Sequence, residues 1–169
     1  MARLLIGLSI ACLFLAACDS GTEVPDGFTE AESDPVTFAH PEDWSEGTPT
    51  GGAQLQIDAS EGGATTGVQV FVDEEEGGDT AARATALAAE LRTSVEDFEV
   101  IEQAEAEVDG AESATLLEYS FTTPDGTAHS WDILAEGPDG EQVIFRVAGN
   151  EDNLSEDTAT QILDTLSFE

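Results

Sequence analysis

Apolar and polar residues alternate along most of the chain, which predicts short β-strands separated by turns. Turn-forming residues separate the strands, with a hairpin turn at residues 61–63 and a further turn at Asp109-Gly110. Because strands joined by such short turns are antiparallel neighbours, the pattern predicts an antiparallel sheet. We expect its strands over residues 36–39, 54–59, 66–73, 98–108, 113–122, 127–135 and 142–148.

Two segments instead repeat their apolar residues at helical spacing. The first follows Asp79, a typical N-cap residue, and its stripe contains Ala84, Leu87, Ala88, Leu91 and Val95. The second covers residues 154–166, and its stripe contains Ala159, Ile162, Leu163 and Leu166. We therefore expect one amphipathic helix in the middle of the chain and one at its end.

Several predicted strands carry apolar residues on both faces, such as Leu116 opposite Leu117 and Val143 opposite Ile144. Both faces of the sheet then need a cover, which the two helices can supply. The pattern predicts a single α+β domain, in which an antiparallel sheet of about six to seven strands has helices packed on its faces.

The N-terminus follows the pattern of a bacterial lipoprotein signal. Arg3 gives a positive end, residues 4–14 are apolar, and Leu15-Ala16-Ala17 precedes Cys18. We expect cleavage before Cys18 and acyl chains on that residue, which would anchor the protein without a transmembrane helix. The alternative is a plain signal peptide with an incidental cysteine.

The remaining chain divides into a spacer and a domain. The spacer is rich in Gly, Pro and acidic residues, a composition typical of a flexible tether. The domain has the length of one folding unit and contains all of the expected strands and helices. We expect a signal peptide over residues 1–17, a lipidated cysteine and flexible acidic tether over residues 18–34, and the domain over residues 35–169.

The strong negative charge of the chain excludes some classes of binding partner. The chain has 37 Asp and Glu against four Lys and Arg, for a net charge of −33. Such a domain repels nucleic acid and anionic headgroups, so we expect it to bind neither directly. A solvated acidic surface adapted to high salt explains this composition. A cation site in the acidic run 73–79 is the alternative, but the run lacks the ligand spacing of a calcium loop.

The order of several motifs resembles a known family. An early strand leads into Phe38-Ala39-His40-Pro41-Glu42-Asp43-Trp44, a Val-Asp-Gly-Ala turn lies at residues 108–111, and the last helix ends in Ile162-Leu163-Asp164-Thr165-Leu166-Ser167-Phe168. This order resembles the PsbP-like family over about residues 33–169, and within it the actinobacterial lipoproteins of the LpqN type. The resemblance implies an α/β/α sandwich that acts as a binding or assembly module and not as an enzyme.

Candidate catalytic groups are few. Only His40 and His129 could serve as general bases, and no serine lies in a nucleophile-elbow pattern. We expect His40 in a surface loop before Pro41, and His129 half-buried on the sheet beside Trp131. We predict no catalytic residue, no cofactor and no metal site.

Three aromatic residues with a polar group remain as binding candidates: Trp44, Tyr119 and Trp131. In most proteins such residues belong to the core, but they also line grooves between a helix and a sheet. Arg146 lies between apolar residues of a central strand, so we expect it to pair with Asp132 or Glu118 on a neighbouring strand.

These features predict a non-catalytic binding or assembly module of the bacterial cell envelope. We expect it on the extracytoplasmic face of the cell membrane, held there by acyl chains on Cys18, with an envelope protein as its partner. The alternative is a carrier of a small apolar or lipidic ligand in a groove between sheet and helix. A hydrolase and a calcium-binding protein are the remaining, weaker alternatives.

The acidity predicts a salt-dependent stability. At 1 M salt the Debye length is only about 3 Å, so repulsion between the carboxylates is screened. We expect thermal unfolding to begin at a lower temperature in low salt than in molar salt, as followed by circular dichroism. Equal midpoints at the two salt concentrations would contradict the halophilic interpretation.

Overall fold

The structure is a computed structural model that describes residues 23–59, 66–73 and 78–169. The signal peptide, Cys18, the hairpin turn at residues 61–63 and most of the acidic run 73–79 lie outside the described residues. Neither of the described helices is long and apolar enough to span a membrane.

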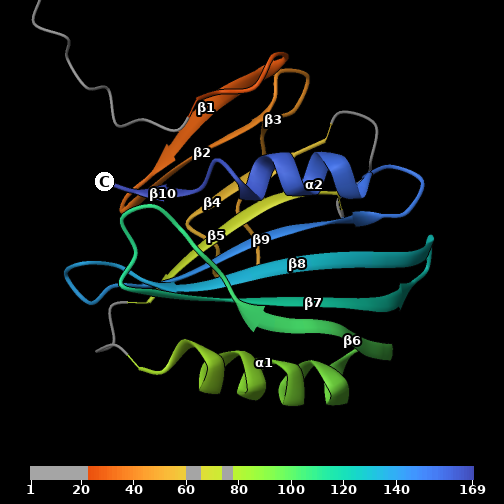
Figure 1. The fold of residues 1–169 in the computed structure, drawn as a ribbon. Helices are drawn as coiled ribbons and strands as arrows, with labels where there is room; N and C mark the ends of the chain where they lie inside the picture. Colours follow the sequence, from red (N-terminus) through yellow and green to blue (C-terminus); the bar gives the residue numbers. More distant parts are fainter. Residues whose placement is uncertain (1–22, 60–65, 74–77) are drawn as a thin grey trace, which may run out of the picture.

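The described chain forms ten strands and two helices, which Figure 1 colours in sequence order. The strands are β1 (Phe28–Ser33), β2 (Val36–Pro41), β3 (Ser45–Glu46), β4 (Leu55–Asp58), β5 (Gly67–Asp73), β6 (Glu96–Glu105), β7 (Ser113–Thr123), β8 (Gly126–Glu136), β9 (Gln142–Asn150) and β10 (Ser167–Phe168). The helices are α1 (Thr80–Ser94) and α2 (Glu156–Leu163). The predicted α+β class is therefore confirmed.

The strands form two antiparallel sheets. The large sheet has seven strands in the order β3-β4-β5-β9-β8-β7-β6, and the small sheet has three in the order β1-β2-β10. Helix α1 packs on β6, β7 and β8, while α2 packs against β2 and β9. Figure 1 shows the large sheet between α1 on one side and the small sheet with α2 on the other.

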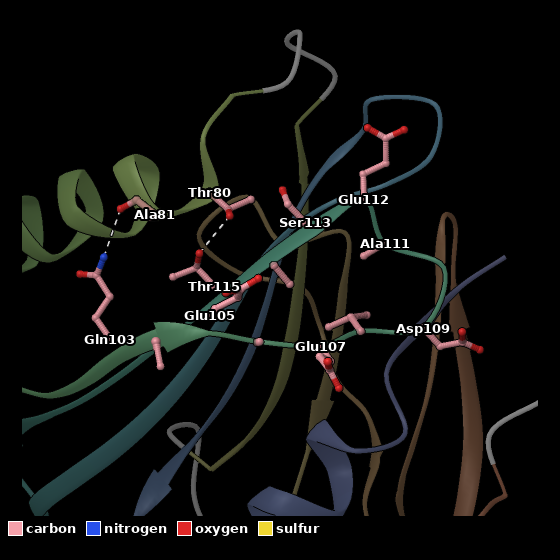
Figure 2. Close-up of a pocket in the computed structure, with 14 residues that line it drawn as sticks. Thr80, Ala81, Gln103, Glu105, Glu107, Asp109, Ala111, Glu112, Ser113 and Thr115 are labelled. Atoms are coloured by element: carbon pink, nitrogen blue, oxygen red, sulfur yellow. Dashed lines mark hydrogen bonds between the residues drawn. The ribbon is translucent and has the colours of Figure 1, made fainter.

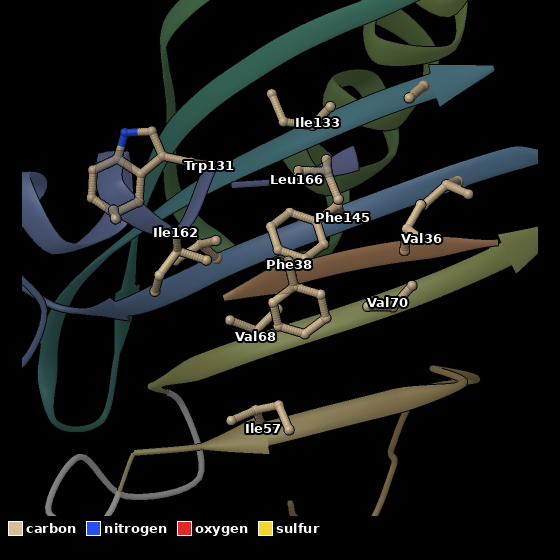
Figure 3. Packing of buried hydrophobic residues seen from close by; sticks show 14 of the residues in the cluster. Val36, Phe38, Ile57, Val68, Val70, Trp131, Ile133, Phe145, Ile162 and Leu166 are labelled. Atoms are coloured by element: carbon tan, nitrogen blue, oxygen red, sulfur yellow. The ribbon is translucent and has the colours of Figure 1, made fainter. Parts of the chain in front are cut away.

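The main core lies between the large sheet and the layer made by the small sheet and α2. Phe38 of β2 packs on Phe145 of β9, with ring centroids 4.9 Å apart in an edge-to-face arrangement. Ile162 of α2 enters the same cluster (Figure 3). The buried apolar residues on the same face of β5, β8 and β9 complete it, namely Val68, Val70, Trp131, Ile133, Val143 and Val147.

A second, smaller core lies under α1. Ala84 and Ala88 of the helix pack against Leu117, Tyr119 and Leu134 of the sheet. The carboxylate of Asp79 caps the helix, because it accepts hydrogen bonds from the Ala81 and Ala82 amides at 3.0 and 3.2 Å. The predicted cap and helical stripe are confirmed, and so is the prediction that strands β7 and β8 are apolar on both faces.

The small sheet corrects the predicted boundaries. Residues 28–33, assigned from composition to the flexible tether, form β1 and pair with β2 over its whole length. Residues 167–168, expected only to close the chain, form β10 and pair with the other edge of β2. Both strands have few apolar residues. They are held by backbone pairing with β2, which composition and periodicity do not reveal.

Two further elements are shorter than expected. Strand β6 ends at Glu105 instead of residue 108, because the chain leaves the sheet for the turn at Asp109-Gly110. There the Phe168 amide donates to the Asp109 carbonyl at 2.8 Å, and Gly110 has φ 78° with the Phe168 carbonyl too close for a Cβ atom. Helix α2 begins only after its N-cap Ser155 and ends at Leu163.

Two isoleucines test the position of the core. Ile162 is fully buried, whereas Ile101 on the edge strand β6 is 49 % exposed. We expect Ile162→Ala to lower the free energy of unfolding by about 2–5 kcal/mol, because it removes buried methylenes and leaves a cavity. The matched variant Ile101→Ala should change it by less than about 0.5 kcal/mol. Equal losses in chemical denaturation would contradict the described packing.

Candidate functional site

A line of polar side chains crosses the face of the large sheet that carries α1. The strand register places Gln56 of β4 opposite Gln69 of β5, Gln69 opposite Arg146 of β9, and Arg146 opposite Asp132 of β8. We call these four residues the polar row. Helix α1 packs on β6, β7 and β8. Only Asp132 of the polar row lies on one of these strands, and the other three residues lie on strands that α1 does not cover.

A buried ion pair forms the inner end of the polar row. Arg146 donates from Nε to one Asp132 oxygen at 2.9 Å and from Nη2 to the other at 2.6 Å. Asp132 is fully buried. Burial lowers the pKa of Arg146, and attraction by Asp132 more than reverses that effect, so the pKa moves upward overall. The prediction that Arg146 pairs with Asp132 or Glu118 is confirmed, and the structure selects Asp132.

Two hydroxyl groups complete the environment of Asp132. Ser130 donates to it at 2.8 Å and Tyr119 at 3.3 Å. Tyr119 is 2 % exposed, and its ring packs between Phe98 and Phe121 at centroid distances of 5.2 and 5.9 Å. Burial, and then the negative charge of Asp132, raise the pKa of the Tyr119 phenol above its ordinary value of 10.0.

A cavity of about 180 Å³ opens over this polar row, and we call it the sheet-face cavity. Its lining combines amide, hydroxyl and guanidinium groups with apolar walls, from Gln56, Ile57, Asp58, Thr66, Gly67, Val68, Gln69, Tyr119, Phe121, Ser130, Arg146 and Ala148. The Arg146 guanidinium lies 5.4 Å from the centre of the Phe71 ring, a cation–π contact. Buried, fixed donors around a cavity are typical of a site that holds a small polar group.

The structure separates the three aromatic candidates. Tyr119 lines the sheet-face cavity on the α1 side of the sheet. Trp131 projects from the opposite face into a second hollow of about 230 Å³, which it shares with Glu118, His129 and Glu151. Trp44 is buried in the main core. The three side chains therefore do not form one groove.

The two histidines differ in burial: His129 is half-buried, and His40 is buried. His129 is half-buried beside Trp131, with ring centroids 5.7 Å apart, as predicted, and its Nε2 atom lies 3.2 Å from a carboxylate oxygen of Glu151. The prediction for His40 was wrong, since it is 6 % exposed within β2 and its Nδ1 lies 2.9 Å from the Pro41 carbonyl. Strand β2 continues to Pro41 because β1 pairs with it along that whole stretch.

Glu118 illustrates the electrostatics of the hollow beside Trp131. Loss of solvent raises the pKa of its carboxyl group, attraction by His129 acts in the opposite direction, and repulsion by Glu156 adds to the increase. The overall direction is upward. The attraction by His129 therefore does not offset the loss of solvent and the repulsion that disfavour the charged form of Glu118.

A third hollow is an open groove of about 740 Å³ at the start of α1, which we call the acidic groove. Figure 2 shows it between the first turn of α1 and the connection from β6 to β7. Thr80 and Thr115 share a buried hydrogen bond of 2.9 Å at its base, and Gln103 donates to the Ala81 carbonyl at 3.2 Å. Four carboxylates are among its lining residues: Glu105, Glu107, Asp109 and Glu112.

These carboxylates do not converge on a metal position. Within residues 23–59, 66–73 and 78–169, no group of three or more His, Cys, Asp or Glu side chains is arranged to hold a metal ion. The groove carries negative charge spread along an open wall.

Comparisons with known proteins show similarity at the level of the fold. No family model and no curated protein sequence matches the chain. Among solved structures, LpqN, involved in cell envelope biogenesis of Mycobacterium tuberculosis, is 16 % identical with a TM-score of 0.55, over 83 % of this chain and 89 % of that one. The chain has an LpqN-like fold.

Two further solved structures match the chain. A Bacteroides thetaiotaomicron protein is 11 % identical with a TM-score of 0.53, over 80 % of this chain and 45 % of that one. A Pseudomonas aeruginosa protein of unknown function is 15 % identical with a TM-score of 0.48, over 82 % of this chain and 94 % of that one. At 11 % identity the likeness to the Bacteroides protein concerns the fold alone.

Sequence reasoning found part of the sheet-face cavity. The pairing of Arg146 and the aromatic character of Tyr119 were visible, but the contribution of Gln56 and Gln69 was not. The available signal was the alternation of β5, which places Gln69 on the face opposite Val68 and Val70. A glutamine on the face of β5 opposite its buried valines indicates that this face has polar neighbours. The sequence does not show that β4 and β9 supply these neighbours, because that depends on the order of the strands in the sheet.

The only tyrosine of the chain reports directly on this site. Since the folded state favours the neutral phenol, its contribution to stability is fully present below the unfolded pKa of about 10 and is lost as the pH rises toward the higher folded value. We expect ultraviolet absorbance of the phenolate to appear at a higher pH in the folded protein than in the urea-unfolded chain. Coincident titration curves would contradict the burial of Tyr119 beside Asp132.

Proposed function

We propose that the protein is a lipid-anchored, extracytoplasmic binding module of the bacterial cell envelope, with no catalytic activity of its own. The lipoprotein signal ending at Cys18 supports the anchor. The LpqN-like fold supports a role in the envelope, because LpqN is involved in cell envelope biogenesis.

The acidic groove is the observation that carries the choice of partner. It is open, about 740 Å³ in volume, and four of its lining residues are carboxylates while none is basic. An extended protein segment with Lys or Arg side chains matches both its shape and its charge. We therefore propose that the partner is an envelope protein that places a basic segment in this groove.

The dimensions of the other hollows favour this partner over a lipidic ligand. Pockets that enclose drug-sized ligands commonly measure about 300–1,000 Å³ and are mostly apolar. The sheet-face cavity and the hollow beside Trp131 measure about 180 and 230 Å³ and are lined by charged groups. A long acyl chain fits neither of them.

The positions of the histidines support a non-catalytic module. His129 is engaged with Glu151, and His40 faces the Pro41 carbonyl. Neither is hydrogen-bonded to a serine or threonine hydroxyl in the described part of the chain. A nucleophile with an adjacent general base, as acyl-transfer enzymes require, is not assembled from these residues.

Crosslinked capture from intact cells at native salt tests this function. The bait is the full chain, compared with a groove variant carrying Glu105→Gln, Glu107→Gln and Glu112→Gln. The matched control carries Glu90→Gln, Glu96→Gln and Glu99→Gln, which removes the same charge from exposed residues at the other end of α1 and β6. We expect an envelope protein to be captured by the wild type and the control, and its recovery to fall about tenfold or more with the groove variant.

A third bait, Cys18→Ser, tests the anchor in the same experiment. Without the thiol we expect no acylation, and loss of the processed protein from the membrane fraction. Processed Cys18→Ser protein that stays in the membrane would overturn the lipid anchor. Equal capture by the groove variant would overturn the acidic groove as the partner site, and recovery of lipids alone would favour the carrier alternative.

A further inference from the structure

We propose that the sheet-face cavity is a second binding site, which takes a small uncharged ligand with an amide or similar carbonyl group. This site is separate from the acidic groove, since the two hollows share no lining residue. Three properties of the described residues determine the class of ligand: an unused donor, a neutralised charge and a pair of side-chain amides.

Arg146 provides the donor. Its Nε and Nη2 atoms are both used by Asp132, whereas Nη1 makes no hydrogen bond to any described residue. The two-point pair with a fully buried carboxylate holds the guanidinium plane in place. A carbonyl oxygen in the cavity can therefore accept from Nη1 without the entropy cost of ordering a long flexible side chain.

The charge of the cavity selects against anions. Asp132 already neutralises Arg146, and Asp58 is a further acidic lining residue, so the lining has no excess positive charge. The whole chain carries a net charge of −33, which repels a carboxylate or phosphate before it reaches the site. A cation would in turn face the Arg146 guanidinium. A neutral acceptor avoids both costs.

The outer end of the polar row fits an amide. Gln69 donates from Nε2 to the Gln56 Oε1 atom at 3.1 Å, and Gln56 donates to Asp58 at 2.7 Å. These bonds orient the amides and leave the Gln69 carbonyl oxygen without a hydrogen bond to any described residue. Since paired strands lie about 4.8 Å apart, Gln69 and Arg146 can contact the two ends of one small amide.

The volume limits the size of the ligand. The cavity of about 180 Å³ is smaller than the pockets of about 300–1,000 Å³ that enclose drug-sized ligands, so it takes only a small molecule or one end of a larger one. The apolar side chains of Phe121 and Ala148 accommodate a methyl or similar group beside the carbonyl. The matching ligand is thus a small amide, or the amide end of a larger molecule.

Magnetic resonance of the arginine side chains tests the site. The chain contains four arginines and no lysine, so the Nε–H signal of Arg146 can be followed beside those of Arg83 and Arg92. The probes are acetamide, the isosteric anion acetate, and methylammonium, added to the isotope-labelled full chain in detergent. We expect acetamide to shift the Arg146 signal saturably with an affinity of about millimolar, and acetate and methylammonium to bind at least tenfold more weakly.

Gln69→Leu distinguishes an assembled site from a free guanidinium. It removes the amide with little change in volume, and we expect it to weaken acetamide binding about tenfold, the effect of one lost hydrogen bond. Gln161→Leu, at an exposed position of α2 outside the sheet-face cavity and the acidic groove, is the matched control and should leave the affinity unchanged. An unshifted phenol titration of Tyr119 in each variant shows that the sheet is still folded.

Four results would overturn the proposal. Acetamide could fail to shift the Arg146 signal saturably, or it could shift the Arg92 signal equally. Acetate could bind as tightly as acetamide, or Gln69→Leu could leave the affinity for acetamide unchanged. Each of them leaves the partner-capture result untouched, because no groove residue is altered in Gln69→Leu and no cavity residue is altered in the groove variant.

Discussion

The large sheet is apolar on both faces, and the rest of the structure follows from the need to cover both. On one face, Phe145 and its neighbours are covered by the small sheet and α2, with Phe38 and Ile162 as the main contacts. On the other face, α1 covers Leu117 and Leu134. Helix α1 rests on three of the seven strands, and the β4, β5 and β9 end of the polar row occupies the part of the face that continues beyond it.

The Arg146–Asp132 pair shows how a very acidic chain uses its few basic residues. Taking two charges out of water is costly, and a hydrophobic pair of the same volume would often be at least as stable. The cost is offset here by two-point geometry and by the Ser130 and Tyr119 hydroxyls, which satisfy the remaining oxygen lone pairs. A polar cluster completed in this way fixes the positions of donors next to the sheet-face cavity.

The two proposed sites use different physics. The acidic groove depends on long-range attraction between its carboxylates and a basic segment, which salt weakens and which acts most strongly on association. The sheet-face cavity depends on short-range hydrogen bonds from side chains that packing holds in place, which salt affects little. A protein that works at high salt can retain the second kind of recognition while the first is screened.

The sequence alone determined six of the seven strands of the large sheet, all but β3. It also determined the cap at Asp79, the apolar stripes of both helices, and that Arg146 pairs with a carboxylate of a neighbouring strand. Each of these depends on neighbours close in sequence or on a strand joined by a short turn. Only the tertiary structure decided that β1 and β10 pair with β2, that His40 is buried, and that Gln56 and Gln69 lie beside Arg146. The pairs β10–β2 and β5–β9 join segments far apart in the chain. Strand β1 is only two residues from β2, but it is polar and is held by backbone pairing, which accepts almost any side chain and so leaves little trace in the sequence.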